Sequence, residues 1–481
     1  MDTIPENVAI CTDIYALAIA HGASRELCDK IMKRFNSYIG DRLPHLLSSY
    51  CTKKILRDIY PVKPKSYPVC QNGCMLLSNP SPNVAECPYC MCTFFYPNHK
   101  PKQTVEYLSL SDQLALMVKD DGTRDLLKYG QQYSASDDGV MYDMFDSPLM
   151  KKIKKTHLFD GDINLSLILF TDDFQPFKRS SHSMMLVHGI VLDLSPEVRY
   201  EQKNMLQICT TPGPRTIDVS SFLEPVLQDL KAMAKDGFLV QIGNAKLRVK
   251  AHLMLVGGDM PAVAKMTGLV GHTGYYGCRF CYINGTTSVM RDYHILTLHI
   301  GEHNGSTVTF PPEDVASDIR LPDMYKSLHP SVGQRYASPF SMLPSFHGYT
   351  FFPMDIMHLL GHGIAHQVWN IMRGSYDKNS NPLYLSTVNR SIIGKQFIIS
   401  KQTTPSSFSG SCGDIEQKAG FFRAVDWIHF ARFFLPTIVL EYVSNPVARR
   451  ALYHLSNIYA IAFSRRIIQK DVKLLKISVA G

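Results

Sequence analysis

Residues 165–173 read LSLILFTDD, a nearly continuous apolar run that ends in two acidic residues. Such a run is typical of a short strand that is buried in a sheet. Similar patterns predict three more strands, and apolar residues that recur every three to four positions predict a helix. The strands are expected at Ser183–Leu194, Met205–Thr210 and Lys246–Val256, and the helix at Val219–Lys235. The predicted order along the chain is three strands, a helix and a further strand.

Changes in residue composition and in the spacing of apolar residues divide the 481 residues into six segments. We expect a helical N-terminal region, a small cysteine module, a polar irregular connector, a strand-rich core, an insertion with a cysteine pair and a mostly helical C-terminal part. These segments are placed, in order, at 1–60, 61–100, 101–160, 161–272, 273–370 and 371–481. In the first segment Ser24 is expected to cap a helix that contains Leu27 and Ile31.

The composition argues against wholesale disorder and against a membrane span. Hydrophobic residues make up 45% of the chain and aromatic residues 10%, which is enough for a buried core. No apolar stretch approaches the roughly 20 residues of a membrane span, and the start MDTIPENVAI has no signal pattern. We therefore expect an intracellular protein with no membrane partner. The 50 Lys and Arg against 42 Asp and Glu give a net charge of +8, a mild excess that suits a phosphate-bearing partner.

Two of the predicted strands end in an aspartate. Asp172 follows the first strand, and Asp259 follows two glycines at the end of the last one. If these strands are neighbours, the two carboxylates lie close together, and their repulsion favours cations between them. Mg²⁺ prefers carboxylate and phosphate oxygen, and two ions about 4 Å apart support phosphodiester cleavage. A lone aspartate at a strand end commonly just starts a turn, but two of them in this strand order favour a metal site.

Four cysteines in two close pairs form the strongest local motif. Cys70 and Cys74 are followed, after twelve residues, by Cys87 and Cys90. Two such knuckles are typical of a zinc-ribbon-like module, which folds only around its metal. Cys92 is a spare thiol that would substitute for Cys90.

A second cysteine pair, Cys278 and Cys281, supplies half of a tetrahedral zinc site. Three histidines at four-residue spacing stand on a predicted helix downstream, at His358, His362 and His366. That spacing places them along one helix face, where His358 and either of the other two would complete a Cys2His2 site.

Together these motifs resemble CACTA (En/Spm-type) transposases, a family that includes fungal and plant transposase-domain proteins. The similarity runs over roughly residues 60–440, and no single motif decides it. The first-aspartate motif of the family commonly reads TDGFxPF and stands here as TDDFQPF. The similar segments, in chain order, are Tyr67–Cys74, Glu86–Cys90, Thr171–Phe177, Pro212–Pro214, Phe222–Lys231, Gly258–Ala262, Gly277–Cys281 and Phe352–Leu359.

The resemblance implies a DDE-type DNA transposase with an RNase H-like α/β core, a mixed sheet flanked by helices. Three strands, a helix and a strand is also the opening order of that fold. Asp172, Asp259 and a later acidic residue would hold catalytic Mg²⁺ or Mn²⁺, and the insertion would bind structural Zn²⁺. The third acid of the family, in a Glu-Trp pair, appears here as Asp426 before Trp427, with Glu416 and Glu441 as alternatives.

The sequence also departs from the family pattern. Asp173 replaces the usual glycine and adds a negative charge beside the expected site. Asp426 is one methylene shorter than the usual glutamate. The chain also ends at Gly481, sooner than we expect of a full-length element.

The sequence alone supports two functional hypotheses. The first is a transposase that cuts and joins DNA at transposon ends, as a homo-oligomer on DNA in the nucleus. The Lys-rich run 151–155 (KKIKK) is then either a nuclear-import patch or an ordinary solvated cluster. The second is a catalytically inactive, domesticated protein that uses the same zinc-stabilised fold to bind DNA or a partner. The third acid and the DNA that flanks the coding region discriminate between them.

Overall fold

The computed structural model describes most of the chain. The described ranges are 5–40, 45–59, 61–79, 86–135, 139–156, 158–175, 184–212, 218–271, 274–282, 319–405 and 413–480.

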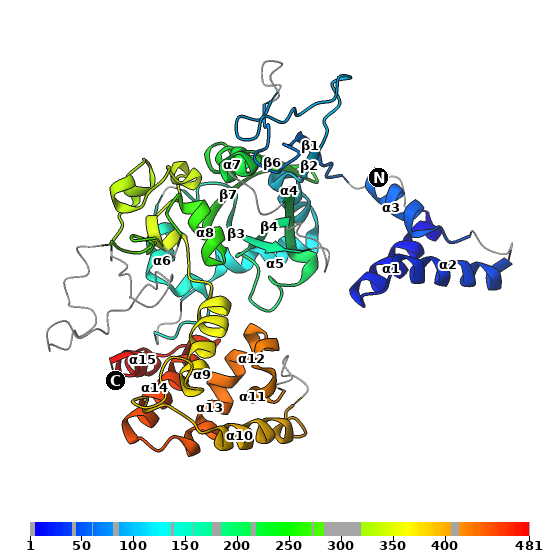
Figure 1. Cartoon of the computed structure of the whole chain (residues 1–481). Coiled ribbons are helices and arrows are strands. Elements are labelled where there is room, and N and C mark those ends of the chain that lie inside the picture. The colour runs from blue at the N-terminus through cyan, green and yellow to red at the C-terminus, as the bar shows by residue number, and fades with distance from the viewer. Residues whose placement is uncertain are drawn as a thin grey trace.

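Seven strands form one curled mixed sheet in the order β1-β2-β5-β4-β3-β7-β6 (Figure 1). Their bounds are β1 Lys65–Pro68, β2 Thr104–Tyr107, β3 Ile163–Phe174, β4 Met184–Val191, β5 Met205–Pro212, β6 Phe238–Ile242 and β7 Ala245–Gly258. β3 pairs antiparallel with β4 and parallel with β7, and the other pairs are antiparallel. The strands expected from the apolar runs are therefore present.

Both faces of the central strand β3 are covered, which explains why its sequence is apolar at consecutive positions. Leu165, Leu167 and Leu169 belong to the main hydrophobic core. Ile168, on the other face, belongs to a second core.

Helices from distant parts of the chain provide this cover. The main core contains side chains of α4, α7 and α8, and the second core contains side chains of α6. The helices of the sheet-centred part are α4 Leu110–Lys119, α5 Asp121–Gln132, α6 Pro148–Lys154, α7 Val219–Lys235 and α8 Met260–Thr267, with short turns at Met144–Asp146 and Gln202–Asn204. The mixed α/β architecture matches the sequence-based expectation.

Two parts of the sheet region differ from expectation. The segment expected to be an irregular connector contains β2 and α4–α6, because Leu110, Leu114 and Val118 fall on one buried helix face. The hairpin of β6 and β7 was also missed. Its two-residue loop is Gly243-Asn244, and Gly243 has φ +55°, a conformation that glycine adopts without strain.

The C-terminal part is helical and has its own hydrophobic core, built around Trp369, Trp427 and Phe430. Its longer helices are α9 His366–Met372, α10 Thr387–Ser400, α14 Pro446–Ala462 and α15 Gln469–Ala480, and its shorter ones are α11 Ile415–Lys418, α12 Ala424–His429 and α13 Leu435–Thr437. A π-helical segment, η9 Met357–Ala365, leads into α9, and a second one spans Phe430–Phe434. Short turns lie at Pro322–Tyr325, Pro330–Val332, Pro339–Met342, Gly348–Phe351, Ala419–Phe421 and Val439–Tyr442.

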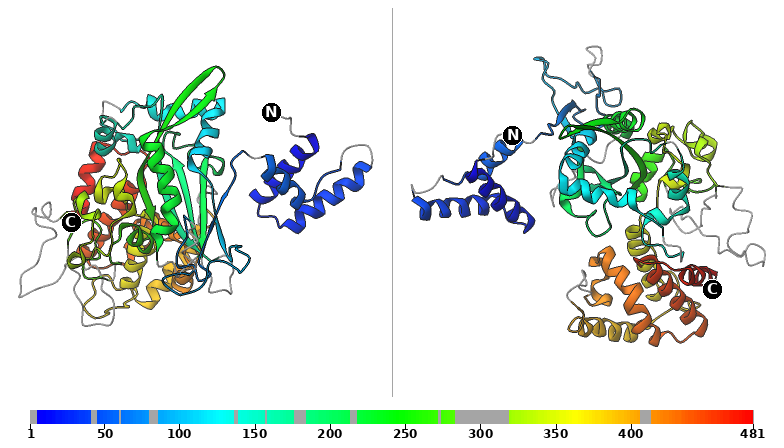
Figure 2. Two further views of the ribbon diagram at one scale, coloured as in Figure 1. Left: turned by 90° about the horizontal axis from the view of Figure 1, so that it is seen from above. Right: turned by 180° about the vertical axis from the view of Figure 1, so that it is seen from behind.

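The N-terminal helices form a small unit that stands apart from the rest in each view (Figures 1 and 2). They are α1 Glu6–Ala20, α2 Arg25–Ile39 and α3 Ser49–Ile59. Cys11, Cys28 and Met32 lie in their shared core. Ser24 caps α2 by accepting a hydrogen bond from the backbone N–H of Leu27 (3.2 Å), as its position predicts. Across the described helices of the whole chain, length and apolarity never combine to the extent that crossing a membrane requires.

Candidate metal and carboxylate sites

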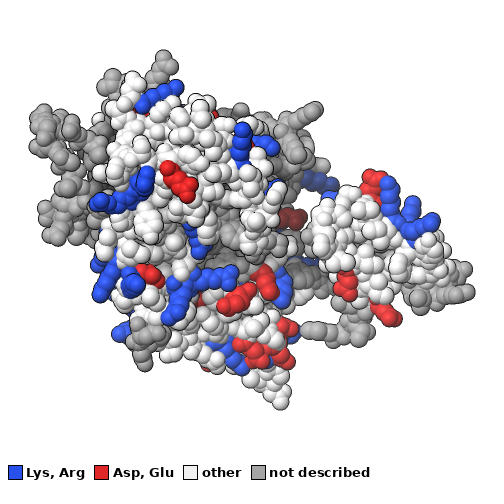
Figure 3. Space-filling model, turned by 90° about the horizontal axis from the view of Figure 1, so that it is seen from below, with Lys and Arg blue, Asp and Glu red and all other residues white. Residues whose placement is uncertain are grey.

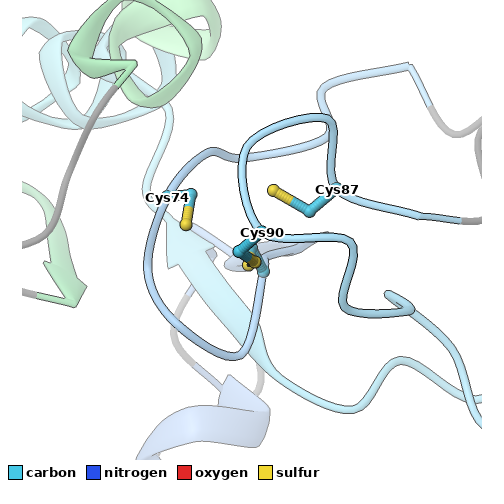
Figure 4. A group of neighbouring side chains, drawn as sticks. Cys74, Cys87 and Cys90 are labelled. Carbon is cyan, nitrogen blue, oxygen red and sulfur yellow. The ribbon is translucent and has the colours of Figure 1, made fainter.

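The four cysteines of the N-terminal module come together in the structure. The sulfur atoms of Cys70, Cys74, Cys87 and Cys90 all lie within 4.8 Å of one another, and the first three residues are buried. Figure 4 shows the sulfurs of Cys74, Cys87 and Cys90 turned toward a common centre. Four thiolates at this spacing can hold one tetrahedral Zn²⁺ ion. Cys92 lies outside the group; its sulfur accepts a hydrogen bond from Asn72 (3.4 Å).

Two short backbone turns build this cluster. In the first, the N–H of Gly73 donates to Cys70 O (2.8 Å), and Gly73 has φ +70°. In the second, the N–H of Met91 donates to Cys87 O (2.8 Å), and Met91 has φ +59° although it is not glycine. Such a conformation in a non-glycine residue is uncommon and marks a constrained turn. Its strain is consistent with a turn that is shaped around a ligand.

The thiols of this cluster differ in acidity. The backbone N–H of Cys92 is the main cause that lowers the pKa of Cys90 to about 6. Burial raises the pKa of Cys87 and Cys74. Because zinc binds the thiolate form, metal binding would release the protons that Cys74 and Cys87 hold.

The module is attached firmly to the sheet. It is inserted between β1 and β2, which pair with each other, and β2 extends the sheet beside β5. The backbone N–H of Asp218 donates to Cys74 O (3.0 Å), and that of Leu76 donates to Ser221 Oγ (2.9 Å), which ties the module to the start of α7. The cysteine cluster is thus continuous with the mixed sheet.

Asp172 lies on β3, two residues before its end, and Asp259 directly follows the neighbouring strand β7. β3 and β7 run parallel, and Thr171 pairs with Gly258, so the residue after each member of this pair is an aspartate. Paired strands lie about 4.8 Å apart, which keeps the two backbones close at this point. Both strands reach this edge of the sheet with their C-terminal ends.

The two glycines before Asp259 permit this close approach. A Cβ atom on Gly257 would lie 2.7 Å from the ring of Phe170, and one on Gly258 would lie 2.9 Å from Thr171 Oγ1. Side chains at either position would push β7 away from β3. The Gly-Gly-Asp sequence therefore follows from the packing of this strand pair.

The Asp259 carboxylate also has a structural task. Its Oδ1 accepts a hydrogen bond from the backbone N–H of Ala262 (2.7 Å) and so caps α8. Capping satisfies a helix N–H and places a negative charge at the positive end of the helix dipole. It fixes the orientation of the carboxylate.

Side chains alternate between the two faces of a strand, so Asp172 and Asp173 lie on opposite faces of β3. Thr171 and Asp173 line a small cavity with Lys265 and Met266 of α8 on the main-core side. Asp172 is displayed on the opposite face, the face of Phe170. Burial raises the pKa of Asp173, and the carboxylates of Asp259 and Asp172 raise it further, while the charge of Lys265 opposes the shift.

His188 is a residue near Asp172 that the sequence reading did not identify. It lies on β4 opposite Phe170, and the two rings stack at 5.6 Å. Burial lowers the pKa of His188, and the Asp172 carboxylate opposes that shift. Its only sequence signal is a polar residue inside a predicted apolar strand.

The three candidates for the third acid have different environments. Asp426 is buried in α12 and accepts hydrogen bonds from the backbone N–H (2.9 Å) and Nε (3.2 Å) of Arg423. Glu416 forms ion pairs with Arg390 (3.2 Å) and Arg373 (3.8 Å). Glu441 is exposed at the surface. Two arginines already neutralise Glu416, which makes it the weakest of the three as a cation ligand.

The second cysteine pair is close but is not gathered with the histidines. The sulfurs of Cys278 and Cys281 are 3.6 Å apart. Within the described ranges, three or more metal-ligand atoms cluster only at Cys70, Cys74, Cys87 and Cys90. Most of the intervening insertion, residues 283–318, lies outside the described residues.

Arg320 organises the loop of the second pair. Its Nε donates to the carbonyls of Cys278 (2.9 Å) and Cys281 (3.2 Å), and its Nη2 donates to the carbonyl of Val332 (2.9 Å). Arg320 is almost fully buried, and sequence inspection gave no reason to select it. These hydrogen bonds fix the backbone of the loop.

The histidine segment is π-helical rather than α-helical. A Cβ on Gly361 would lie 2.8 Å from Ala424 O, so only glycine allows α12 to pack this closely on η9. His358 donates from Nδ1 to Asp355 (2.5 Å), which leaves Nε2 as its ligand atom. The ring of His366 instead packs on the ring of Trp427, with the ring centres 4.9 Å apart. Partial burial lowers the pKa of His362, and the charges of His358 and His366 lower it further.

A cavity of about 180 Å³ connects these segments. Its lining includes Gly258 at the end of β7, Cys278, and both Asp355 and His358. Of the candidate zinc ligands, Cys278 and His358 therefore share one cavity, and it borders the carboxylate edge of the sheet.

Comparison with known protein families shows a similarity over part of the chain. Residues 138–302 match the Transposase family tnp2, over about a third of the chain. No curated protein matches the chain. The matched segment contains β3, β4, β5, α7, β7 and α8, and therefore both Asp172 and Asp259. This match supports a transposase family for the protein.

Proposed function

We propose that this protein is a metal-dependent DDE-type DNA transposase that cleaves and transfers DNA strands at transposon ends. Asp172 and Asp259 are its first two catalytic carboxylates, and Asp426 is the third. The observation that supports the proposal is the parallel pairing of Thr171 with Gly258, since the residue that follows each of them is an aspartate.

The sheet order supports an RNase H-like core of the CACTA type. The first three strands of the core form an antiparallel meander, β3-β4-β5, and β7 returns parallel to β3 after α7. The resulting spatial order of these strands is β5-β4-β3-β7. The match to the Transposase family tnp2 covers this same segment.

The chemistry of the donor set suits a hard cation. Two carboxylates, one of them oriented by its cap on α8, offer the oxygen ligands that Mg²⁺ prefers. When bound there, Mg²⁺ or Mn²⁺ would supply activation of water and stabilisation of the leaving oxygen. The role of the chain is to hold the carboxylates in place. Asp173, which faces Lys265 of α8, is not assigned to this donor set, although the charges of Asp259 and Asp172 raise its pKa.

The zinc sites have structural roles in this proposal. Zn²⁺ at Cys70, Cys74, Cys87 and Cys90 stabilises the module between β1 and β2. A second Zn²⁺ is held by Cys278, Cys281, His358 and either His362 or His366. The shared cavity of Cys278 and His358, and the Asp355 hydrogen bond that orients His358, support this second site.

DNA is the proposed partner, bound by a homo-oligomer in the nucleus. The net charge is +8, and on the face seen in Figure 3 the Lys and Arg side chains are scattered among Asp and Glu. DNA binding of this kind depends on phosphate contacts and falls as salt is raised.

The alternative function is a catalytically inactive DNA-binding or interaction protein. The burial of Asp426 and its hydrogen bonds to Arg423 favour this alternative, because they give the carboxylate a structural role. Asp426 is also one methylene shorter than the glutamate of the family.

Strand cleavage on the element's own DNA ends distinguishes the two functions. With Mg²⁺ or Mn²⁺, the unmodified protein should cleave, and Asp172→Asn or Asp259→Asn should abolish cleavage while DNA binding is kept. Asp173→Asn is the matched control, since it removes a neighbouring charge on the opposite face and should retain cleavage. Absence of cleavage by the unmodified protein would favour the inactive alternative.

A further inference from the structure

Helix α2 carries an apolar ridge that nothing in the described structure covers. Leu27, Ile31, Phe35 and Tyr38 are exposed by 49%, 42%, 51% and 76% of their surface, respectively. At 100° per residue these four positions fall within an arc of about 80° on the helix. A different face of α2, which carries the buried residues Cys28 and Met32, packs in the core of the three-helix unit.

The ridge is therefore additional to the face that holds the three-helix unit together. A run of large exposed side chains on one helix face marks an interaction surface more often than isolated ones do. Helices pack through rows of residues spaced four apart, and Leu27, Ile31 and Phe35 form such a row. The unit also stands apart from the body of the protein, with the ridge-bearing α2 at its outer side (Figures 1 and 2).

Charges beside the ridge specify the partner. Glu26, Lys30 and Arg34 form the adjacent row, with the acidic residue at one end and an arginine at the other. Glu26 is bonded within the helix to Lys30 (2.6 Å), and Arg34 lies over the ring of Tyr38 (5.2 Å). An antiparallel copy of α2, centred on Ile31, would bring Glu26 of each copy toward Arg34 of the other.

We propose that α2 is a self-association surface, at which two copies of this chain pair their α2 helices antiparallel about Ile31. The ridges interdigitate, with Leu27 of one copy against Phe35 of the other. An interface of one helix face is small, so a weak dimer is expected in free solution. Two such chains held on one DNA molecule would pair more strongly through effective concentration.

Sedimentation of the full chain without DNA tests this proposal, over roughly 1 to 100 µM, a range chosen for a weak interface. The unmodified protein should show a concentration-dependent dimer. Ile31→Glu places two carboxylates at the centre of the pair and should weaken association at least about tenfold. Ile399→Glu is the matched control, because Ile399 is exposed on α10 in the C-terminal part, and it should leave association unchanged.

Charge reversal tests the antiparallel register. Glu26→Arg or Arg34→Glu alone should each weaken the dimer by about two- to tenfold, as expected for exposed ion pairs, and the double variant should restore it. The proposal is overturned if the unmodified chain stays monomeric, or if Ile31→Glu associates normally. It is equally overturned if Ile31→Glu weakens DNA binding alone, since the ridge then contacts DNA. The measurement needs no DNA, so its outcome is independent of the proposed cleavage activity.

Discussion

The sheet-centred part and the helical C-terminal part of this protein hold their candidate ligands in different ways. In the sheet-centred part, two local turns gather Cys70, Cys74, Cys87 and Cys90, and Asp172 and Asp259 each directly follow one paired position of β3 and β7. In the helical part, the candidate ligands have separate neighbours. His358 bonds to Asp355, whereas Asp426 bonds to Arg423.

This difference shows which sites a backbone can form by itself. A knuckle or a parallel strand pair fixes the positions of its residues through main-chain hydrogen bonds. A site between helices requires the helices to pack in one arrangement, which side chains and bound metal decide together. We therefore expect perturbation of the first kind of site to be the more severe.

The largest effect is expected for the cysteine module. Cys87→Ser should remove one zinc ion per chain and unfold the segment between β1 and β2, because metal binding supplies about 10 kcal/mol or more to the folding of such modules. Cys92→Ser, the matched control, should keep the zinc. Metal analysis of untagged protein and limited proteolysis measure both effects. Equal zinc content in the two variants would contradict the assignment of Cys87.

A smaller effect is expected at the second cysteine pair. Cys278→Ser should lower the zinc content from two ions to one and should leave the surrounding loop folded, because Arg320 holds the carbonyls of Cys278 and Cys281. Thermal unfolding should shift less than for Cys87→Ser. Comparison of His362→Ala with His366→Ala identifies the fourth ligand. If Cys278→Ser keeps two zinc ions, this second site does not exist.

The smallest effect on stability is expected for the acids of the helical part. Glu416→Gln should destabilise the protein by roughly 1–3 kcal/mol, because Arg390 is buried and loses its charged partner. Cleavage per folded molecule should remain. Asp426→Ala should instead abolish cleavage if Asp426 is the third ligand. If Glu416→Gln is stable but inactive, the roles of the two acids are reversed.

The same difference explains what the sequence could predict. The cysteine knuckles and the aspartates near strand ends are local patterns. The four cysteines cluster as predicted and Asp259 follows β7, whereas Asp172 lies inside β3, which continues to Phe174. Arg320 and His188 were not recognisable, because their partners are brought to them by tertiary packing. The connector helices were missed since buried Leu110, Leu114 and Val118 are embedded in a polar segment. The π-helical form of η9 depends on Ala424, which is distant in sequence.

The central claim, that Asp172 and Asp259 share one cation, can be tested by Fe²⁺-directed backbone cleavage. Fe²⁺ substitutes for Mg²⁺ at carboxylate ligands, and with peroxide and ascorbate it generates hydroxyl radicals that cut the chain beside the ion. Fragment masses from the full-length protein should show two cuts, one beside Asp172 and one beside Asp259. Both cuts should disappear together in Asp172→Asn and in Asp259→Asn, and both should persist in Asp173→Asn. Cuts that occur elsewhere, or that each respond only to their own substitution, would contradict a shared site.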